Sequence, residues 1–187
     1  MTNLELFQIL RQIVLSVTDV EECILADQNK PGPKKSVKYP KGEYAVIQPQ
    51  QSVTERGQAN IIRTAKAGAL MDTDIRAQIA CTAWINFYRG DTRTQATKLK
   101  QCNKRPDISA LLFKNNLGWS GTSAVQNLTA LQSENYESRA QIAINLWYET
   151  SDSVEINTIE RINGSIEYED GTTVSTWDLE TPDAPPV

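Results

Sequence analysis

The chain has 187 residues, 40% of them hydrophobic and 22% charged, which suits one globular domain and argues against wholesale disorder. It contains no histidine, which removes the commonest general base and most zinc sites. The net charge of −4 combines +5 over residues 1–148 with −9 over residues 149–187, a split that indicates either a solvated acidic tail or surfaces that meet charged partners, including other copies of the chain.

The start of the chain predicts an amphipathic helix over residues 3–17. Thr2 and Glu5 form a capping-box pattern, in which each side chain accepts a hydrogen bond from the backbone amide of the other residue. Behind this cap, apolar residues recur at the spacing of one helical face. The segment lacks the positive start and the small-residue cleavage site of a signal peptide, so we expect this helix to belong to the mature protein.

A basic segment rich in proline separates this helix from the first strand. Residues 25–49 hold five lysines and four prolines, which suit either a loop that grips phosphates or a stiff connector that leads into a sheet. Only Tyr39 and Tyr44 could stack on bases, and the chain as a whole is acidic, so the connector is the favoured interpretation. The first strand is predicted over residues 43–48 and is expected to end at Pro49.

A loop and then a long strand are predicted next. Residues 50–70 are mostly small or polar, and we expect a mobile loop or an extended arm there. Between residues 74 and 88 apolar and polar residues alternate, which predicts a long strand with one buried face. Its sequence RAQIA at residues 76–80 recurs at residues 139–143, an offset of 63. We interpret this echo as two neighbouring strands under the same packing rules rather than as a duplication.

Two short helices are predicted after this strand. The first covers residues 92–102, is basic, and is expected to be capped by Asp91 or Thr92. The second begins near Pro106, a favoured residue in the first turn of a helix, and is expected to stop at Gly118.

The second half of the chain predicts a loop, two strands and a tail. Residues 119–136 are interpreted as a loop and residues 140–148 as a second long alternating strand. A third strand over residues 155–168 is expected to run through Asn163-Gly164, because a turn there would place two glutamates opposite each other. Asp170-Gly171 is the better turn signal, and the chain then ends in a polar tail closed by prolines.

No catalytic, cofactor-binding or metal-binding site is predicted. Without histidine, an acid/base pair would need two carboxylates or a lysine with an aspartate, and no motif nominates such a pair. No glycine-rich phosphate loop or EF-hand occurs, and no apolar run approaches the roughly 20 residues that span a bilayer. An enzyme is therefore the disfavoured class. The cysteines, which show no CxxC spacing and are expected to be free thiols in a reduced compartment, are Cys23, Cys81 and Cys102.

Several short motifs follow one another along residues 3–168. They are QNKPGP (28–33) with GEYAVI (42–47), YRGD (88–91) at the end of a strand, RAQ (139–141) and IERI (159–162). In these motifs the chain resembles the neck or tail-terminator proteins of tailed bacteriophages, especially the neck terminator family of contractile-tailed phages. It departs from the family by the insert KKSVKYPK before Tyr44, and the resemblance assigns neither residues 49–74 nor residues 170–187.

The resemblance implies an α+β fold with a mixed, mainly antiparallel β-sheet, helices packed on one face, and extended loops or arms. From the sequence itself we expect one domain over residues 1–169 and an acidic tail or arm over residues 170–187. The resemblance also implies a non-enzymatic virion protein, assembled in the host cytoplasm as a hexameric ring on the end of the tail tube. The ring would stop tube polymerisation and join the tail to the head-side connector.

The partners implied by the resemblance are other copies of the chain, the tail tube protein, the head-side connector and, in a contractile tail, the sheath protein. DNA would pass through the channel without specific binding, and neither a cofactor nor a membrane partner is implied. One alternative is another neck component, such as a head-completion or sheath-capping protein. From a different class, a nucleic-acid-binding module could use the lysines of residues 30–41.

Charged residues are the candidate contacts of such a ring. The basic body and the acidic C-terminal part could form complementary faces between neighbouring subunits. The residues expected at partner interfaces are Lys30, Lys34, Lys35, Lys38, Lys41, Arg93, Lys98, Lys100, Asp178, Glu180 and Asp183. The residues expected to line a negative channel, along which DNA slides without sticking, are Glu155, Glu167 and Glu169.

Overall fold

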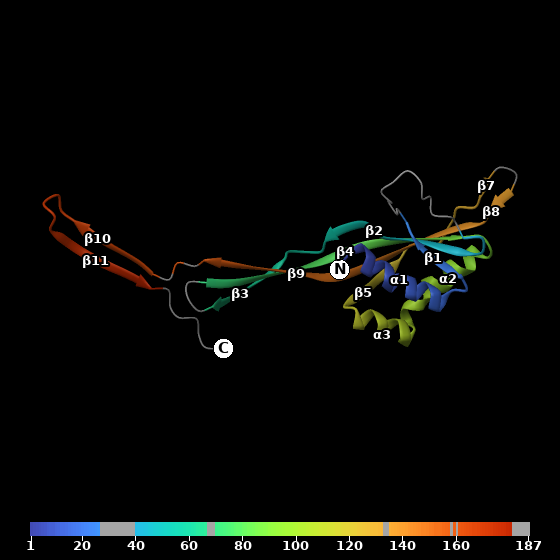
Figure 1. Cartoon of the computed structure of the whole chain (residues 1–187), viewed down its shortest axis with the longest axis horizontal. Helices are drawn as coiled ribbons and strands as arrows, with labels where there is room; N and C mark the ends of the chain where they lie inside the picture. The colour runs from blue at the N-terminus through green and yellow to red at the C-terminus, as the bar shows by residue number, and fades with distance from the viewer. Residues whose placement is uncertain (27–39, 67–69, 133–134, 158, 160, 181–187) are drawn as a thin grey trace. The chain divides into compact units, whose positions relative to one another are not determined.

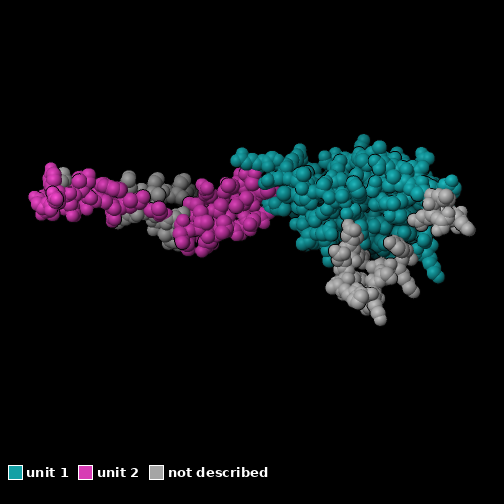
Figure 2. Space-filling model, turned by 90° about the horizontal axis from the view of Figure 1, so that it is seen from above, with its two compact units in different colours: residues 1–58, 78–150 teal, residues 59–77, 151–187 magenta. Residues whose placement is uncertain are grey.

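The computed structural model describes residues 1–26, 40–66, 70–132, 135–157, 159 and 161–180. These residues belong to two compact units, which Figure 2 shows in different colours. Unit 1 consists of residues 1–58 and 78–150, and unit 2 of residues 59–77 and 151–187. Two long strands, β4 (Leu70–Tyr88) and β9 (Arg139–Asn157), contribute residues to both units.

In unit 1, a sheet is covered on one face by three helices (Figure 1). The strands follow the order β1-β2-β4-β9-β5, with β1 parallel to β2 and with the pairs β2–β4 and β5–β9 antiparallel. The predicted α+β fold with a mixed, mainly antiparallel sheet is therefore confirmed. Besides β4 and β9, the elements are α1 (Asn3–Val17), β1 (Glu22–Leu25), β2 (Tyr44–Glu55), α2 (Thr92–Gln101), a 3-10 turn (Cys102–Lys104), α3 (Pro106–Lys114), β5 (Leu117–Thr122), β6 (Gln126–Asn127), β7 (Ala130–Gln132) and β8 (Asn135–Glu137).

The core between sheet and helices is built from the apolar faces that the sequence predicted. Within unit 1, every second residue of β4 and β9 points toward the helices, and the apolar stripe of α1 packs against them. Burial of this apolar surface is the main favourable term in folding. The largest fully buried side chains are Phe87, Leu6, Leu10, Ile13, Ile47, Ile85, Leu99, Ile108, Ile142, Ile144, Leu146 and Val14.

The predicted starts of α1 and α2 are confirmed by their side-chain caps, and α3 begins at Pro106 as predicted. Thr2 Oγ1 accepts a hydrogen bond from the backbone N–H of Glu5 at 3.2 Å, and the backbone N–H of Thr2 donates to Glu5 Oε2 at 2.7 Å. At α2, the carboxylate of Asp91 accepts from the backbone N–H of Thr94 at 3.3 Å. Each cap satisfies amides that the first helical turn leaves without an intrahelical partner.

The repeated RAQIA sequence marks neighbouring strands, as predicted. β4 and β9 are adjacent in the sheet. Within unit 1, Thr82 Oγ1 on β4 donates to Asn145 Oδ1 on β9 at 3.1 Å, and these two residues are 63 positions apart, which is the offset of the repeat.

Strand β2 is longer than predicted, because Pro49 does not end it. β2 pairs with β4 on both sides of this proline, and the pairing shifts register between Gln48 and Ser52. Proline has no N–H to donate to the ladder, so the strand bulges there and pairing resumes beyond it. Residues 50–70 were predicted to form a mobile loop or an extended arm; their described part holds the end of β2 and strand β3 (Asn60–Lys66), so the mobile loop is wrong.

The predicted stop of α3 at Gly118 is wrong. The helix is capped by Asn115, and Asn116 takes the left-handed backbone conformation (φ 51°) that often follows a helix. Gly118 lies in β5, opposite Trp147 of β9. The loop predicted over residues 119–136 was also wrong, because its described part contains most of β5, β6 and the paired strands β7 and β8.

In unit 2, β3 pairs antiparallel with the first residues of β4, and β10 (Arg161–Glu167) forms a separate two-stranded hairpin with β11 (Thr173–Glu180). β10 runs through Asn163-Gly164 as predicted, and the chain turns at Asp170-Gly171, where Gly171 has φ 83°. The predicted third strand was wrong at its start, since Glu155 belongs to β9.

Much of the predicted C-terminal arm is a strand. Its residues 173–180 form β11, so the predicted domain boundary at residue 169 lies at the turn of a hairpin. Residues 181–187 lie outside the described part of the chain.

Candidate interaction surfaces

The predicted basic loop is represented in the structure by its last lysine. Lys41 is exposed just before β2. Whether the loop contacts a protein partner or nucleic acid therefore remains a prediction. The predicted contact residues of this loop that lie outside the described ranges are Lys30, Lys34, Lys35 and Lys38.

A basic surface covers α2, α3 and the turn between them. Residues 91–114 hold six basic and two acidic residues, a net charge of +4. Two of these cations are paired within the fold: Lys98 donates a hydrogen bond that lowers the pKa of Asp19, and Arg105 lies 2.7 Å from Asp107. The other four are exposed and form no ion pair with a described residue. We call them the basic helical surface; they are Arg93, Lys100, Lys104 and Lys114.

An apolar groove lies between α3 and the edge strand β5. Leu112 and Phe113 line it from the helix, and Leu117, Trp119 and Tyr148 line it from the sheet, with Leu112, Leu117 and Tyr148 buried at its floor. Polar residues, among them Ser109 and Glu149, also line it. The Phe113 side chain is 87% exposed. A large exposed aromatic side chain beside apolar neighbours is typical of a protein-contact surface. We call the five apolar residues the α3 groove. The sequence predicted its helix with Ile108 and Leu112 on the apolar face, and the structure buries both and leaves Phe113 off that face.

Three of the family-like motifs meet around Tyr88 at one end of β4. The ring of Tyr44 stacks on that of Tyr88 with centroids 4.8 Å apart, and the guanidinium of Arg139 lies 5.1 Å from the Tyr88 ring. The guanidinium of Arg89 lies 5.5 Å from the centroid of the Tyr44 ring. It also donates hydrogen bonds to the backbone carbonyls of residues 40–42. This clamp holds the start of β2 against the end of β4. These motif residues therefore act in the fold.

All three cysteines are free and buried, as expected. Cys23 lies in β1, Cys81 faces the core from β4, and Cys102 caps α2. Burial raises the pKa of the Cys23 thiol to about 12 and the pKa of the other two thiols to about 11. Since the thiolate is the reactive form of cysteine, these thiols are poor nucleophiles.

The folded protein should react with the thiol reagent DTNB at pH 8 at least roughly 100-fold more slowly than the denatured chain, because the raised pKa values leave little thiolate. Absorbance of the released dye measures the rate. Reaction of the folded protein at the denatured rate would contradict the burial of the thiols.

Keeping the thiols neutral stabilises the fold fully below their ordinary pKa of 9.0, and this stability is lost as the pH rises toward 11–12.

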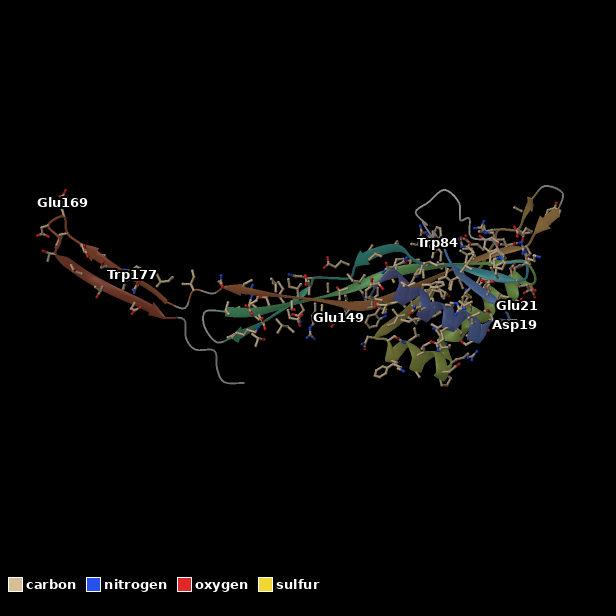
Figure 3. The ribbon with its side chains drawn as sticks, in the orientation of Figure 1. Asp19, Glu21, Trp84, Glu149, Glu169 and Trp177 are labelled. Carbon is tan, nitrogen blue, oxygen red and sulfur yellow. The ribbon has the colours of Figure 1, made fainter. Side chains whose placement is uncertain are left out.

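The β10–β11 hairpin has one apolar and one polar face. In the register of the two strands, Ile162, Ile166 and Trp177 share a face, and they are 47%, 58% and 45% exposed. Trp177 lies over Gly164, where an added Cβ would be 2.4 Å from the indole ring. We call Ile162, Ile166 and Trp177 the hairpin face; Figure 3 labels Trp177 on β11. The sequence indicated that the two isoleucines share a face, but Trp177 was assigned to the tail.

Several predicted acidic contacts gather on this hairpin. Residues 161–180 hold one basic and five acidic residues, a net charge of −4. Glu167 and Glu169 are exposed near the turn, and Asp178 lies on β11 opposite Asn163 (Figure 3 labels Glu169). Glu180 ends β11, while Asp183 lies outside the described residues.

Glu155, the remaining predicted channel residue, lies on β9 and is paired. It accepts a hydrogen bond from Lys66 of β3 at 2.9 Å. Hydrogen bonds to Asp72 and Glu155 raise the pKa of Lys66 to about 12. Glu155 therefore shares the single positive charge of Lys66 with Asp72.

In the described ranges, no group of histidine, cysteine or acidic residues is placed to hold a metal ion. Nor does that part of the chain contain a helix with the length and apolar character needed to cross a membrane.

An exposed apolar face, an apolar groove and separate basic and acidic areas are typical of a structural protein that assembles with other proteins. The model of the phage neck terminator protein family matches residues 4–172, and the chain belongs to this family. This membership confirms the resemblance seen in the sequence. Members of this structural family associate with other phage tail and neck proteins, and the protein is assigned to the tail or neck of a virion. No curated protein matches the chain.

Proposed function

We propose that the protein is the tail terminator of a contractile-tailed phage, a hexameric ring that caps the tail tube, stops its polymerisation and joins the tail to the head-side connector. The observation that carries this proposal is the match to the neck terminator family over residues 4–172. The copy number and the contractile tail are those that the sequence resemblance implies.

The charges of the chain support a ring. A ring needs a heterologous interface, in which one surface of a subunit meets a different surface of the next. Residues 91–114 carry a net charge of +4, and residues 161–180 a net charge of −4. Opposite charges on separate surfaces of one chain favour head-to-tail association between copies.

We assign Glu167 and Glu169 to the channel, because both are exposed and neither forms an ion pair with a described residue. Negative side chains there would repel the phosphates of DNA and let it pass without binding. Glu155 contributes less, since Lys66, which also pairs with Asp72, offsets part of its charge. The proposed partners are the tube protein, the head-side connector and the sheath protein, and assembly in the host cytoplasm suits the free thiols. No catalytic step is part of this function.

A phage that lacks this gene tests the function. We expect electron micrographs of lysates to show tail tubes of uncontrolled length without attached heads, and supply of the protein in trans to restore joined particles. Tubes of normal length beside unattached heads would instead identify a head-completion protein, and normal tubes with loose sheaths a sheath-capping protein. Intact infectious particles in its absence would contradict any role in the neck.

A further inference from the structure

We propose that the β10–β11 hairpin of one copy binds in the α3 groove of a neighbouring copy, with the hairpin face of the first against Phe113 of the second. The inference rests on the proposed ring, and it names the two surfaces through which the ring closes.

The hairpin needs a partner for its apolar face. It consists of two strands, and a two-stranded hairpin alone in water is marginally stable at best. Roughly half of each side chain of the hairpin face is solvent-exposed. The Trp177 indole packs over Gly164 with one side and leaves its other side exposed to a partner. Such a rigid aromatic is the kind of side chain that dominates protein interfaces.

The α3 groove offers a matching surface on another part of the chain. It is lined by Leu112, Phe113, Leu117, Trp119 and Tyr148, and Phe113 projects from it almost fully exposed. Apolar side chains from both partners would meet at the centre, as they do in the buried core of protein interfaces. Aromatic pairs such as Trp177 with Phe113 add to the stability of such a contact.

Charge complementarity identifies the occupant as a second copy. The hairpin residues 161–180 carry a net charge of −4, and the segment that contains α3 carries +4. Lys104 and Lys114 of the basic helical surface flank the groove residues in sequence, while Asp170 lies at the hairpin turn. Charged rims around an apolar centre steer two surfaces together and fix their orientation. The acidic hairpin suits the basic surroundings of α3, and Glu149 is the one acidic residue among those that line the groove.

This contact repeats from subunit to subunit because hairpin and groove are different surfaces. Such head-to-tail contacts close into a ring when the rotation between subunits allows it. The opposite face of the hairpin, which carries Asn163 and Ser165, stays outside the contact. The hairpin could therefore bind a neighbour with one face and line the channel with the other.

Disulfide cross-linking between differently tagged copies tests whether the hairpin binds in the α3 groove. Ser109→Cys places a thiol in the groove, and Ser175→Cys places one on the hairpin face, where residue 175 is paired with Ile166. The matched control is Ser165→Cys on the polar face. The native thiols are buried and should not interfere. After mixing, assembly and oxidation, we expect linked pairs of tagged copies to form several-fold more with Ser175→Cys than with Ser165→Cys.

A second measurement does not depend on cross-linking geometry. Phe113→Ala should raise the protein concentration at half-assembly about tenfold or more, as truncation of a central interface aromatic does. Tyr136→Ala is the control, because this aromatic side chain on β8 is 78% exposed and lies outside both surfaces. Trp177→Ala should act like Phe113→Ala.

The outcomes separate this inference from the proposed function. The binding of the hairpin in the α3 groove is wrong if rings form, Ser109→Cys cross-links no more with Ser175→Cys than with Ser165→Cys, and Phe113→Ala leaves assembly unchanged. The proposed ring would stand in that case. If no ring forms under any condition tested, both the proposed function and the proposed contact between hairpin and groove are wrong.

Discussion

Phe87→Ala is expected to lower the free energy of unfolding by about 3–5 kcal/mol. Phe87 lies on the core face of β4, opposite Ala45 of β2, and its exposed fraction is 0%. Its truncation removes the transfer free energy of the ring and leaves a cavity that close-packed strands and helices cannot fill. Domains are typically stable by only about 5–15 kcal/mol, so this variant would lose a large share of its stability.

The matched control is Phe113→Ala, the same change at a side chain that is 87% exposed. Because little buried surface is lost, the free energy of unfolding should change by no more than about 0.5 kcal/mol. Both variants are measured by denaturant unfolding, followed by circular dichroism, at a concentration too low for assembly, since assembly adds stability of its own. Equal losses would show that the core is not where the structure places it.

Gly118→Ala is expected to cost about 1–3 kcal/mol, because the added methyl group would lie 2.1 Å from Cε2 of Trp147. Gly118 of β5 is the direct cross-strand partner of Trp147 on β9, and the indole lies over the bare glycine backbone. To make room, the ring would have to move, and it would leave the guanidinium of Arg56, which now lies 5.5 Å from its centroid. Denaturant unfolding measures the loss.

A double-mutant cycle with Trp147→Ala isolates this clash. With the indole removed, the methyl group at position 118 has space, so the cost of Gly118→Ala should fall close to zero. If the cost is the same in both backgrounds, the glycine is required by the backbone of β5 and the packing explanation is wrong.

The long strands and α1 could be predicted because each has one buried face. A strand of this kind alternates, as Ala83, Ile85 and Phe87 do on β4, and the burial of these side chains enforces the period. β3 could not be predicted, because all seven of its residues are exposed. Where neither face of a strand is buried, nothing imposes a pattern on the sequence.

Glycine and proline misled the prediction elsewhere. Pro49 and Gly118 are strong breakers by local rules. In the fold, Pro49 lies at a bulge of β2, and Gly118 provides room for Trp147. Gly164 has the same role beneath Trp177. A tryptophan at the cross-strand position was the missing signal, and it can be used only once the register of the strands is known.

The candidate surfaces could be predicted as charges but not as shapes. Net charge is a property of the sequence, so the basic and acidic parts were evident before the fold was known. Helical spacing separates Leu112 from Phe113, but the α3 groove also needs β5 and β9 beside α3. The hairpin face depends on the pairing of Trp177 with Gly164 across two strands. These packing contacts are tertiary, and local sequence does not encode them.

The native mass of the purified protein tests most directly whether it is a ring-forming terminator. We predict a hexamer by native mass spectrometry, either of the protein alone or after addition of tail tube protein. Electron micrographs of the same samples should show annular particles on the ends of the tubes. A strict monomer that neither forms rings nor binds tube ends would contradict this function.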